Sequence, residues 1–544
     1  MTAPPVTLTE DGRSITVTFD AFGLEAYALF LRTKSLPEHE LAYDWETDAY
    51  TLTTPARFAH VLGSDLIARE RHQEPLADHL FDYQRFVVQR ALDGKRFAAW
   101  LDTGLGKGPV ILEWCRQVVS MTGGKVLIIE PLAVIEQLRA EAVRFYGDAL
   151  PIERLNTRED VTSWCKEEGS GIAICNPQKF ITPRGQVDGV MHELRYLAGV
   201  ALDESSLLKS GGGDIKWNLI KSCRGIEYKL SATATPAPND TMEYASQAAW
   251  LEKLRNEGDI LWTYFSKDAN GEWHVKPHAR DAFYKFMASW SIYMRDPAHF
   301  GFADILSTLP PPEIHEYQVP ITDAQQAQRM DLATKSKKGM FNDRMGVQER
   351  SRLSQLAKGF QYNTVRGKKN TALVESNKPQ FVADLIRRRV TEGKQVLVAT
   401  VFDEESAILA DLLSIPMRHI FRDLRIGILT GSMTDEAREN VYAAFKNGHF
   451  DVLISKSQLV GFGLNMQFCR SIVFSGFDDS FERMYQFVRR AYRFGQTQTV
   501  TVDVPYVPEL EGMIFENVMS KEAQFMKDVE AQEAEYRKAM EGVL

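Results

Sequence analysis

The chain has 544 residues, of which 44% are hydrophobic and 25% are charged, the composition of an ordinary globular protein. Its length exceeds what one hydrophobic core supports, and its net charge of −9 excludes binding of nucleic acid through a globally basic surface. No apolar run reaches membrane-spanning length, no signal-peptide pattern is visible, and the five scattered cysteines include no C-x-x-C pair. We therefore expect several domains in a reducing cytoplasm, without structural zinc or disulfides.

Residues 1–75 are expected to form a separate accessory α+β domain. Ser14–Phe19 alternates between apolar and polar residues as a strand does, and Leu24–Leu36 has apolar residues at helical spacing. Tyr43–Leu52 can form a pair of hairpin strands. The sequence leaves open whether this domain is a structural appendage or binds substrate.

From about residue 76, short apolar runs alternate with helix-like stretches, which is the pattern of parallel βαβ units. The first series of expected strands comprises Phe97–Asp102, Val126–Glu130, Ile172–Cys175, Gly199–Asp203 and Tyr228–Ser231. The second comprises Val396–Thr400, Ile426–Thr430, Val452–Ser455, Ile472–Ser475 and Val500–Val504. We predict an α/β fold with two lobes, over 76–310 and 371–505, each built on a parallel sheet of about five strands. A final helix is expected over 506–544.

Two less regular regions lie between these strand series. Residues 250–300 are rich in aromatic side chains and are expected to form a helical insertion in the first lobe. Aromatics at helical spacing favour core packing over stacking on bases, as in Phe283, Phe286 and Trp290. Residues 311–370 are expected to be a basic helical linker, whose charges either bind nucleic acid or are simply solvated.

A glycine loop follows the first strand of the first lobe. Its small residues let backbone N–H groups surround a phosphate, and the helix that follows adds a partial positive charge at its N-terminus. Lys107 would reach the β- and γ-phosphates of ATP. The residues predicted to hold the nucleotide in this loop are Thr103, Gly104, Leu105, Gly106, Lys107 and Gly108.

Position 108 departs from the phosphate-loop pattern, which has Ser or Thr after the lysine because that hydroxyl coordinates Mg²⁺. Gly108 has no side chain. Either a water fills the place of the hydroxyl, which we favour, or the site has lost part of its hydrolytic activity. The first interpretation predicts that Gly108→Thr raises Mg²⁺-dependent ATPase activity.

Asp203 and Glu204 end a strand of the first lobe, where side chains face the carboxyl edge of a parallel sheet. Asp203 is the predicted Mg²⁺ ligand. Glu204 is expected to orient the attacking water and accept its proton. Acidic pairs also occur on ordinary surfaces, but the apolar strand before this pair favours a catalytic role.

Gln486, Arg490 and Arg493 have the spacing of one helix face, and Gly495 is expected to end that helix. Two arginines on such a face can neutralise charge on a transferring phosphoryl group. An ordinary solvated face would explain the arginines alone. The sequence therefore predicts Arg490 and Arg493 as catalytic residues on the second lobe.

Taken in order, these segments resemble the superfamily 2 helicases and translocases, in particular the Swi/Snf branch and its phage-encoded relatives. Phe81-Asp82-Tyr83-Gln84 looks like the family's adenine-reading motif, and Arg490-Ala491-Tyr492-Arg493-Phe494-Gly495-Gln496 looks like its arginine-finger motif. The resemblance implies two RecA-like lobes. It implies nucleotide contacts by Gln84, Gly463 and Gln486. It implies nucleic-acid contacts by Pro131, Asn176, Ser231, Thr233 and Asn465.

The resemblance implies an ATP-dependent DNA translocase or helicase that uses ATP and Mg²⁺ and moves on duplex, forked or single-stranded DNA. Replication, recombination or repair in the cytoplasm of a bacterium or a phage-infected host would be its setting. Ser205-Ser206 after the acidic pair argues against an RNA-unwinding DEAD-box enzyme, and Tyr492 replaces the usual His. The alternative, motivated by Gly108, is a nucleic-acid clamp or scaffold that hydrolyses ATP weakly or not at all.

Overall fold

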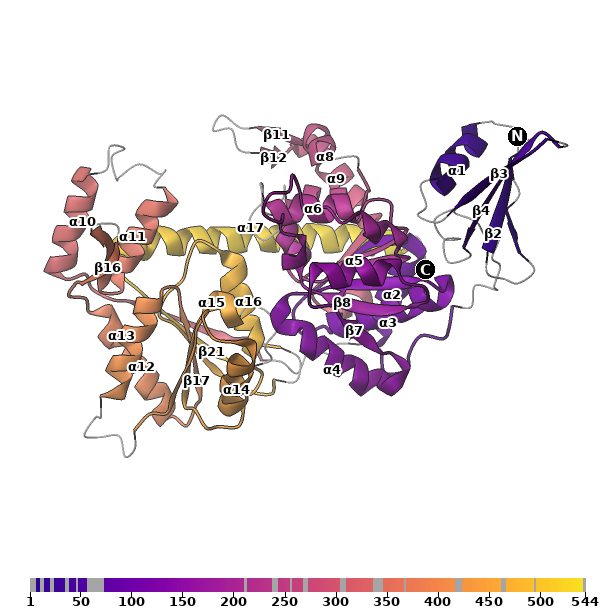
Figure 1. Cartoon of the computed structure of the whole chain (residues 1–544). Coiled ribbons are helices and arrows are strands. Elements are labelled where there is room, and N and C mark those ends of the chain that lie inside the picture. The colour runs from indigo at the N-terminus through magenta and orange to yellow at the C-terminus, as the bar shows by residue number, and fades with distance from the viewer. Residues whose placement is uncertain are drawn as a thin grey trace. The chain divides into compact units, whose positions relative to one another are not determined.

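The structure is a computed structural model, and Figure 1 shows the whole chain. It describes residues 6–9, 14–19, 24–34, 39–45, 47–55, 73–209, 213–236, 243–254, 257–267, 273–303, 310–335, 346–365, 368–415, 423–460, 466–493 and 496–541. The chain divides into two compact units. Unit 1 comprises Met1–Asp102, Gly106–Arg295 and Ala531–Leu544, and unit 2 comprises Thr103–Leu105 and Asp296–Glu530.

The N-terminal residues form the predicted small α+β arrangement. An antiparallel sheet has the strand order β1-β2-β4-β3, with β1 at Val6–Leu8, β2 at Ser14–Phe19, β3 at Glu40–Asp44 and β4 at Ala49–Pro55. Helix α1 spans Leu24–Lys34. Every second side chain of β2 is buried and joins a core with Leu29 and Leu52, which is the outcome that its alternating sequence predicts.

Unit 1 contains a seven-stranded parallel sheet in the order β13-β5-β10-β9-β6-β8-β7. Its strands are β5 (Arg96–Leu101), β6 (Lys125–Ile129), β7 (Ile152–Arg154), β8 (Gly171–Cys175), β9 (Gly199–Leu202), β10 (Tyr228–Ala232) and β13 (Ser291–Met294). All five predicted strands are present. Sequence reasoning missed β7, which has only 3 residues, and β13, which follows the aromatic region.

Helices α2 (Asp82–Gly94), α3 (Lys107–Thr122) and α9 (Arg280–Ala288) contact strands of this sheet (Figure 1). The other helices described in unit 1 are α4 (Ile135–Tyr146), α5 (Arg158–Lys166), α6 (Asp214–Ser222), α7 (Tyr244–Trp250) and α8 (Glu257–Tyr264). A short hairpin of β11 (Phe265–Lys267) and β12 (Trp273–Val275) follows α8. Phe283 and Trp290 are buried as core residues, which confirms the core interpretation of their spacing.

Unit 2 contains a six-stranded parallel sheet in the order β14-β21-β20-β17-β19-β18. Its strands are β14 (Glu313–Gln318), β17 (Val396–Thr400), β18 (Ile426–Leu429), β19 (Val452–Lys456), β20 (Ser471–Phe474) and β21 (Thr501–Tyr506). All five predicted strands are present. The sixth, β14, lies inside the range 311–370 that we expected to be a helical linker, so part of that range belongs to the sheet.

The helices of unit 2 are α10 (Asp323–Lys335), α11 (Val347–Ala357), α12 (Lys378–Thr391), α13 (Asp403–Ser414), α14 (Asp435–Lys446), α15 (Ser457–Val460) and α16 (Phe481–Ala491). A hairpin of β15 (Phe360–Val365) and β16 (Lys368–Leu373) precedes α12, and α17 spans Pro508–Glu541. The predicted α/β class with two parallel-sheet lobes and a small N-terminal α+β domain is thus confirmed. None of the helices described in the structure is long and apolar enough to span a membrane.

Candidate nucleotide-binding site

The predicted glycine loop connects β5 to α3. Gly104 and Gly106 have φ angles of 97° and 70°, a backbone conformation that residues with a Cβ rarely adopt. Gly106 immediately precedes α3, and a Cβ atom at this position would overlap Nε2 of Gln84. The loop therefore needs glycine at position 106 for both its conformation and its space.

Gln84 holds this loop from the first turn of α2. Its Nε2 donates to the carbonyl oxygen of Gly106 over 3.3 Å, and its Oε1 accepts from the backbone N–H of Phe81 over 3.0 Å. The side chain is buried. Sequence reasoning expected Gln84 to contact adenine, and the structure adds a contact with the loop itself.

Lys107 is the first residue of α3, and its Nζ donates to the carbonyl oxygen of Leu101 over 3.1 Å. Of the other loop residues, Leu105 is buried and Thr103 is half-buried. The lysine therefore lies at the N-terminus of α3, where the backbone carries a partial positive charge. An anion is the ligand that suits this end of the helix.

Three polar side chains follow neighbouring strands at one edge of the sheet. Glu130 follows β6, Asn176 follows β8 and Asp203 follows β9. The last residues of these strands are paired, Ile129 with both Cys175 and Leu202. Each polar residue has one buried oxygen without a hydrogen-bond partner: Oε2 of Glu130, Oδ1 of Asn176 and Oδ1 of Asp203. Unpaired buried acceptors are rare, and a cation or a donor would satisfy them.

The charge at this edge is strongly negative. Burial, followed by the Asp203 carboxylate, raises the pKa of Glu130 well above its ordinary value, and Glu204 and Glu141 add to the effect. The raised pKa favours a proton on Glu130, which can then donate a hydrogen bond to Asp203. A bound cation would take the place of that proton, and oxygen donors of this kind are the ligands that Mg²⁺ prefers.

The residues present fit a magnesium–nucleotide complex. Within the described residues, no group of three or more His, Cys, Asp or Glu side chains is arranged to hold a metal by itself. A nucleotide-bound Mg²⁺ needs only one or two protein carboxylates, because phosphates and waters supply the other ligands. The orphaned oxygens of Asp203 and Glu130 and the left-handed glycine before α3 meet these requirements.

Glu204 follows Asp203 in a strained conformation, with a φ of 46°. Its side chain is 9% exposed, and its Oε2 accepts from Oγ1 of Thr233 over 3.4 Å. Non-glycine residues in this region cost energy that the surrounding structure must supply, and they cluster at functional sites. The carboxylate is thereby connected to the segment that follows β10.

Ser231 and Thr233, which were predicted to contact nucleic acid, lie at the end of β10 and in the segment that follows it. Both side chains are completely buried. Ser231 Oγ lies 2.8 Å from Ser205 Oγ and 2.6 Å from Gln247 Oε1, within unit 1. Their polar atoms therefore link the end of β10 to the residues after β9. Of the other predicted contacts in this unit, Asn176 is buried and Pro131 is half-buried.

Gly108, where the phosphate-loop pattern has a hydroxyl, lies against a carboxylate from another helix. A Cβ atom built on Gly108 would overlap Oε2 of Glu141, which projects from α4, and would lie 3.3 Å from Leu138 Cδ1. A carboxylate oxygen thus fills the volume that a threonine side chain would take. Sequence reasoning missed Glu141 because nothing in its own segment marks it.

The predicted arginine-bearing helix of unit 2 is shorter than expected. Helix α16 ends at Ala491, and Tyr492 has φ −86° and ψ 86°, which is not helical. Gln486 and Arg490 are therefore on one helix face and are both buried, but Arg493 lies beyond the helix. The expected end at Gly495 was wrong. Gly463, Asn465 and Gly495 lie outside the described residues.

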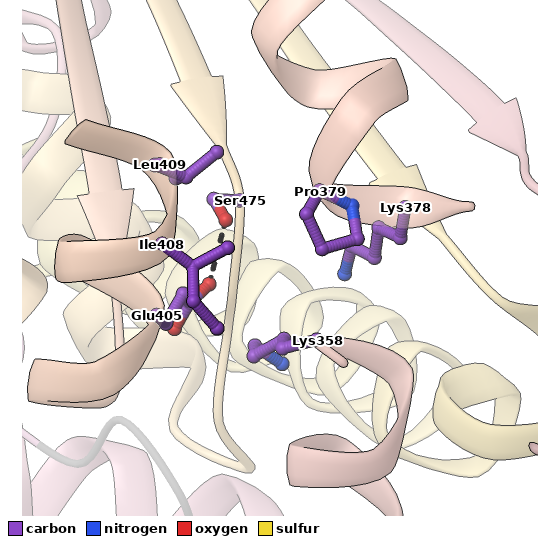
Figure 2. A pocket seen from close by; sticks show the side chains of 7 residues that line it. All are labelled: Lys358, Lys378, Pro379, Glu405, Ile408, Leu409 and Ser475. Carbon is purple, nitrogen blue, oxygen red and sulfur yellow. Dashed lines mark hydrogen bonds between the residues drawn. The ribbon is translucent and has the colours of Figure 1, made fainter. Parts of the chain in front are cut away.

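Unit 2 has a pocket beside a buried ion cluster (Figure 2). Lys358 Nζ donates to Ser354 O, Ser354 Oγ and Glu511 Oε1, so each of its three protons has an acceptor. Lys378 Nζ contacts Glu511 Oε2 at 2.6 Å. Figure 2 shows Glu405 directed toward Ser475, whose hydroxyl donates to it over 2.7 Å. Lys358 was expected to belong to an exposed basic patch and is instead buried.

Comparison with known proteins bears on part of the chain. Residues 377–495 match the family of helicase conserved C-terminal domains. The matched residues lie in the part of unit 2 that holds Gln486, Arg490 and Arg493. The structure is also similar to the Sulfolobus solfataricus SWI2/SNF2 ATPase core in complex with dsDNA, with 16% identity, a TM-score of 0.37, and coverage of 86% of this chain and 98% of that one. At this TM-score the similarity does not support a functional assignment. No curated protein matches the chain.

Proposed function

We propose that the chain is an ATP-dependent DNA translocase or helicase, in which ATP hydrolysis drives movement on DNA. The observation that carries the proposal is in unit 1, where a lysine-bearing glycine loop opens α3 and the same sheet ends in carboxylates with unpaired oxygens. The helicase-type domain over residues 377–495 supports it. Phosphoryl-transfer enzymes of this kind work by positioning and by charge, and these residues can supply both.

The proposed roles follow from the chemistry of each group. Lys107 and the N–H groups of the loop would hold phosphates, and Asp203 would hold Mg²⁺, which neutralises phosphate charge when bound. Glu204 would orient the attacking water and accept its proton. Arg490 and Arg493 would neutralise charge on the phosphoryl group, an effect that contributes about 10³-fold or more in related chemistry. Gln84, Gln486 and Gly463 would complete the nucleotide contacts.

In this proposal DNA is held mainly through its phosphates. Binding should then tolerate any sequence and weaken as the salt concentration rises. Closure of the two lobes on nucleotide would gate hydrolysis, and repeated closure would move the chain along one strand. Duplex or forked DNA is the proposed substrate.

A steady-state ATPase assay with and without duplex DNA tests the proposal. We expect DNA to stimulate hydrolysis, and Glu204→Gln to lower kcat by about 10² to 10⁴, the usual contribution of a general base. Glu159→Gln is the matched control, because Glu159 is an exposed residue of α5. Hydrolysis that is independent of DNA, or equally fast in Glu204→Gln, would contradict the proposal.

A second assay separates the two forms of the motor. Displacement of a triplex-forming oligonucleotide needs only movement along duplex DNA, whereas displacement of a paired strand also needs a wedge. A translocase would displace the triplex strand alone. A helicase would displace both.

A clamp that binds nucleic acid without appreciable hydrolysis is the second candidate, because Gly108 lacks the metal-coordinating hydroxyl. This candidate predicts nucleotide and DNA binding with no DNA-stimulated turnover. The same ATPase assay distinguishes it from the motor.

A further inference from the structure

The first turn of α3 faces a carboxylate from another helix. Leu138 and Glu141 lie on neighbouring turns of α4, and both come close to the space above Gly108. Gln137 Nε2 donates to Glu141 Oε1 over 3.1 Å, so the other oxygen, Oε2, is the one that a Cβ at position 108 would overlap. The side chain is half-buried and is held by its own helix.

Gly108 and Glu141 are therefore complementary. A Cβ atom at position 108 would collide with Glu141, so the carboxylate oxygen lies where the side chain of a phosphate-loop Ser or Thr would begin. The first turn of α3 contains no acidic residue of its own. A carboxylate from α4 is favoured there by the partial positive charge of the helix N-terminus.

A second, independent observation favours a cation in this region. The Glu130 side chain is 1% exposed and its Oε2 has no hydrogen-bond partner, and the neighbouring Asp203 also has an unpaired oxygen. Glu141 is close enough for its charge to act on Glu130. Unpaired buried carboxylate oxygens beside additional negative charge are costly unless a cation joins them.

We infer that Glu141 replaces the missing hydroxyl of position 108 as an oxygen ligand for the divalent cation that accompanies the nucleotide. The inference rests on the proposed function, because it concerns the cation of that same site. A carboxylate carries a full charge where a hydroxyl carries none. The Glu141 carboxylate therefore attracts the cation more strongly than a hydroxyl would. It also repels the phosphates of a nucleotide that binds without a cation.

This charge makes nucleotide binding depend on Mg²⁺ more steeply than a hydroxyl would. In the unchanged protein, ATP should bind much more tightly with Mg²⁺ than with EDTA. Glu141→Ala should weaken binding in Mg²⁺ by about tenfold or more, the scale on which loss of a metal-site carboxylate acts. The same variant should bind ATP in EDTA equally well or better, because a repulsive charge is gone.

The test measures the Kd of a fluorescent ATP analogue in Mg²⁺ and in EDTA by titration, with no turnover required. The variants are Glu141→Ala, Gly108→Thr and the double variant Gly108→Thr/Glu141→Ala. Gly108→Thr alone should weaken Mg²⁺-dependent binding, because its side chain collides with Glu141. The double variant should recover most of that binding, because the threonine hydroxyl then has both the space and the cation. Glu136→Ala, on the same helix and exposed, is the control for loss of one charge.

Recovery in the double variant supports the inference. Unchanged Mg²⁺ dependence in Glu141→Ala would overturn it. So would equally tighter binding with and without Mg²⁺, because Glu141 would then act only by repelling phosphate. If the unchanged protein binds no nucleotide in either condition, the proposed function fails, and the inference fails with it.

Discussion

The two units each bury a cluster of charged side chains, but the clusters are built in opposite ways. In unit 2, Glu511 accepts from Lys358 through one oxygen and from Lys378 through the other, and its Oε2 also accepts from the backbone N–H of Val507. In unit 1, Glu130 and Asp203 are two neighbouring acids without a basic partner for their buried Oε2 and Oδ1 atoms, which have no hydrogen-bond partner. The first cluster is complete without a ligand, whereas the second is not.

The difference shows how a buried charge can be assigned a role. A fully paired cluster stabilises a fold only while it stays intact, because removal of one member leaves its partners buried and unpaired. A cluster with unpaired acceptors costs stability until a ligand binds, which is typical of functional sites. The same substitution should therefore change stability in opposite directions in the two clusters.

The largest effect is expected for Glu511→Gln. The variant leaves two buried ammonium groups without a carboxylate and should lower the free energy of unfolding of unit 2 by about 3–5 kcal/mol. All nine tryptophans belong to unit 1. Denaturant unfolding followed by circular dichroism should therefore show the shift, while tryptophan fluorescence should not. Glu516→Gln, exposed on the same helix, is the control. A loss below about 1 kcal/mol would contradict complete pairing.

Glu130→Gln should have a smaller effect of opposite sign. The carboxyl group must take up a proton on folding because its pKa is raised, whereas the amide donates a hydrogen bond to Asp203 without one, so the variant should raise the free energy of unfolding at neutral pH by about 1 kcal/mol. Tryptophan fluorescence is the suitable probe, because the signal comes from unit 1 alone. Destabilisation on the scale of Glu511→Gln would mean that Glu130 has a partner in the folded protein.

The paired cluster of Lys358, Lys378 and Glu511 in unit 2 also predicts that stability depends on pH. Burial lowers the pKa of Lys378 to about 8 in the folded protein, despite the opposing charge of Glu511. Between pH 8 and the ordinary lysine value, the unfolded chain binds more protons than the folded one, so stability rises with pH. Relative to Lys378→Met, the unchanged protein should gain on the order of 1 kcal/mol per pH unit across this window. A difference that is flat or falls with pH would refute this prediction.

The smallest effect concerns the backbone of Glu204, the residue that follows Asp203 in unit 1. Glu204 has a φ of 46°, so Glu204→Gly should be more stable than Glu204→Ala by about 1 kcal/mol. Both variants lack the carboxylate, and their difference isolates the backbone. Lys95 also has a positive φ, of 55°, but lies away from Glu130 and Asp203 in the sequence. The stability difference between Lys95→Gly and Lys95→Ala therefore serves as the reference. Equal stability of the two Glu204 variants would mean that no strain is stored there.

Sequence reasoning found the residues whose own segment marks them. Asp203 was found because an apolar strand precedes it, and the ten predicted strands formed because their residues are apolar and buried. The same rule applied to Glu130 would have added it to the site, since it also follows a buried strand. Lys107 and Gly106 were found through the glycine pattern and its helix.

The residues that were missed or misplaced depend on packing between segments. Glu141 approaches Gly108, and only the packing of α3 against α4 reveals this. Arg493 was placed on a helix that in fact ends at Ala491, because spacing alone does not locate a helix end. Lys358 looked like part of a basic surface until its buried partner, Glu511, came from a segment 153 residues away.

The position of β14 sets the order in which the second sheet can be completed during synthesis. Glu313 at its start pairs with Thr501 of β21, 188 residues later, so at about 5–20 residues per second β14 waits about 10 to 40 s for its partner. The first sheet is complete much earlier, when β13 pairs with β5. The polar side chains of β14, Glu313, His315 and Glu316, which hid it from sequence prediction, are the kind that keep a waiting edge strand from pairing with other chains.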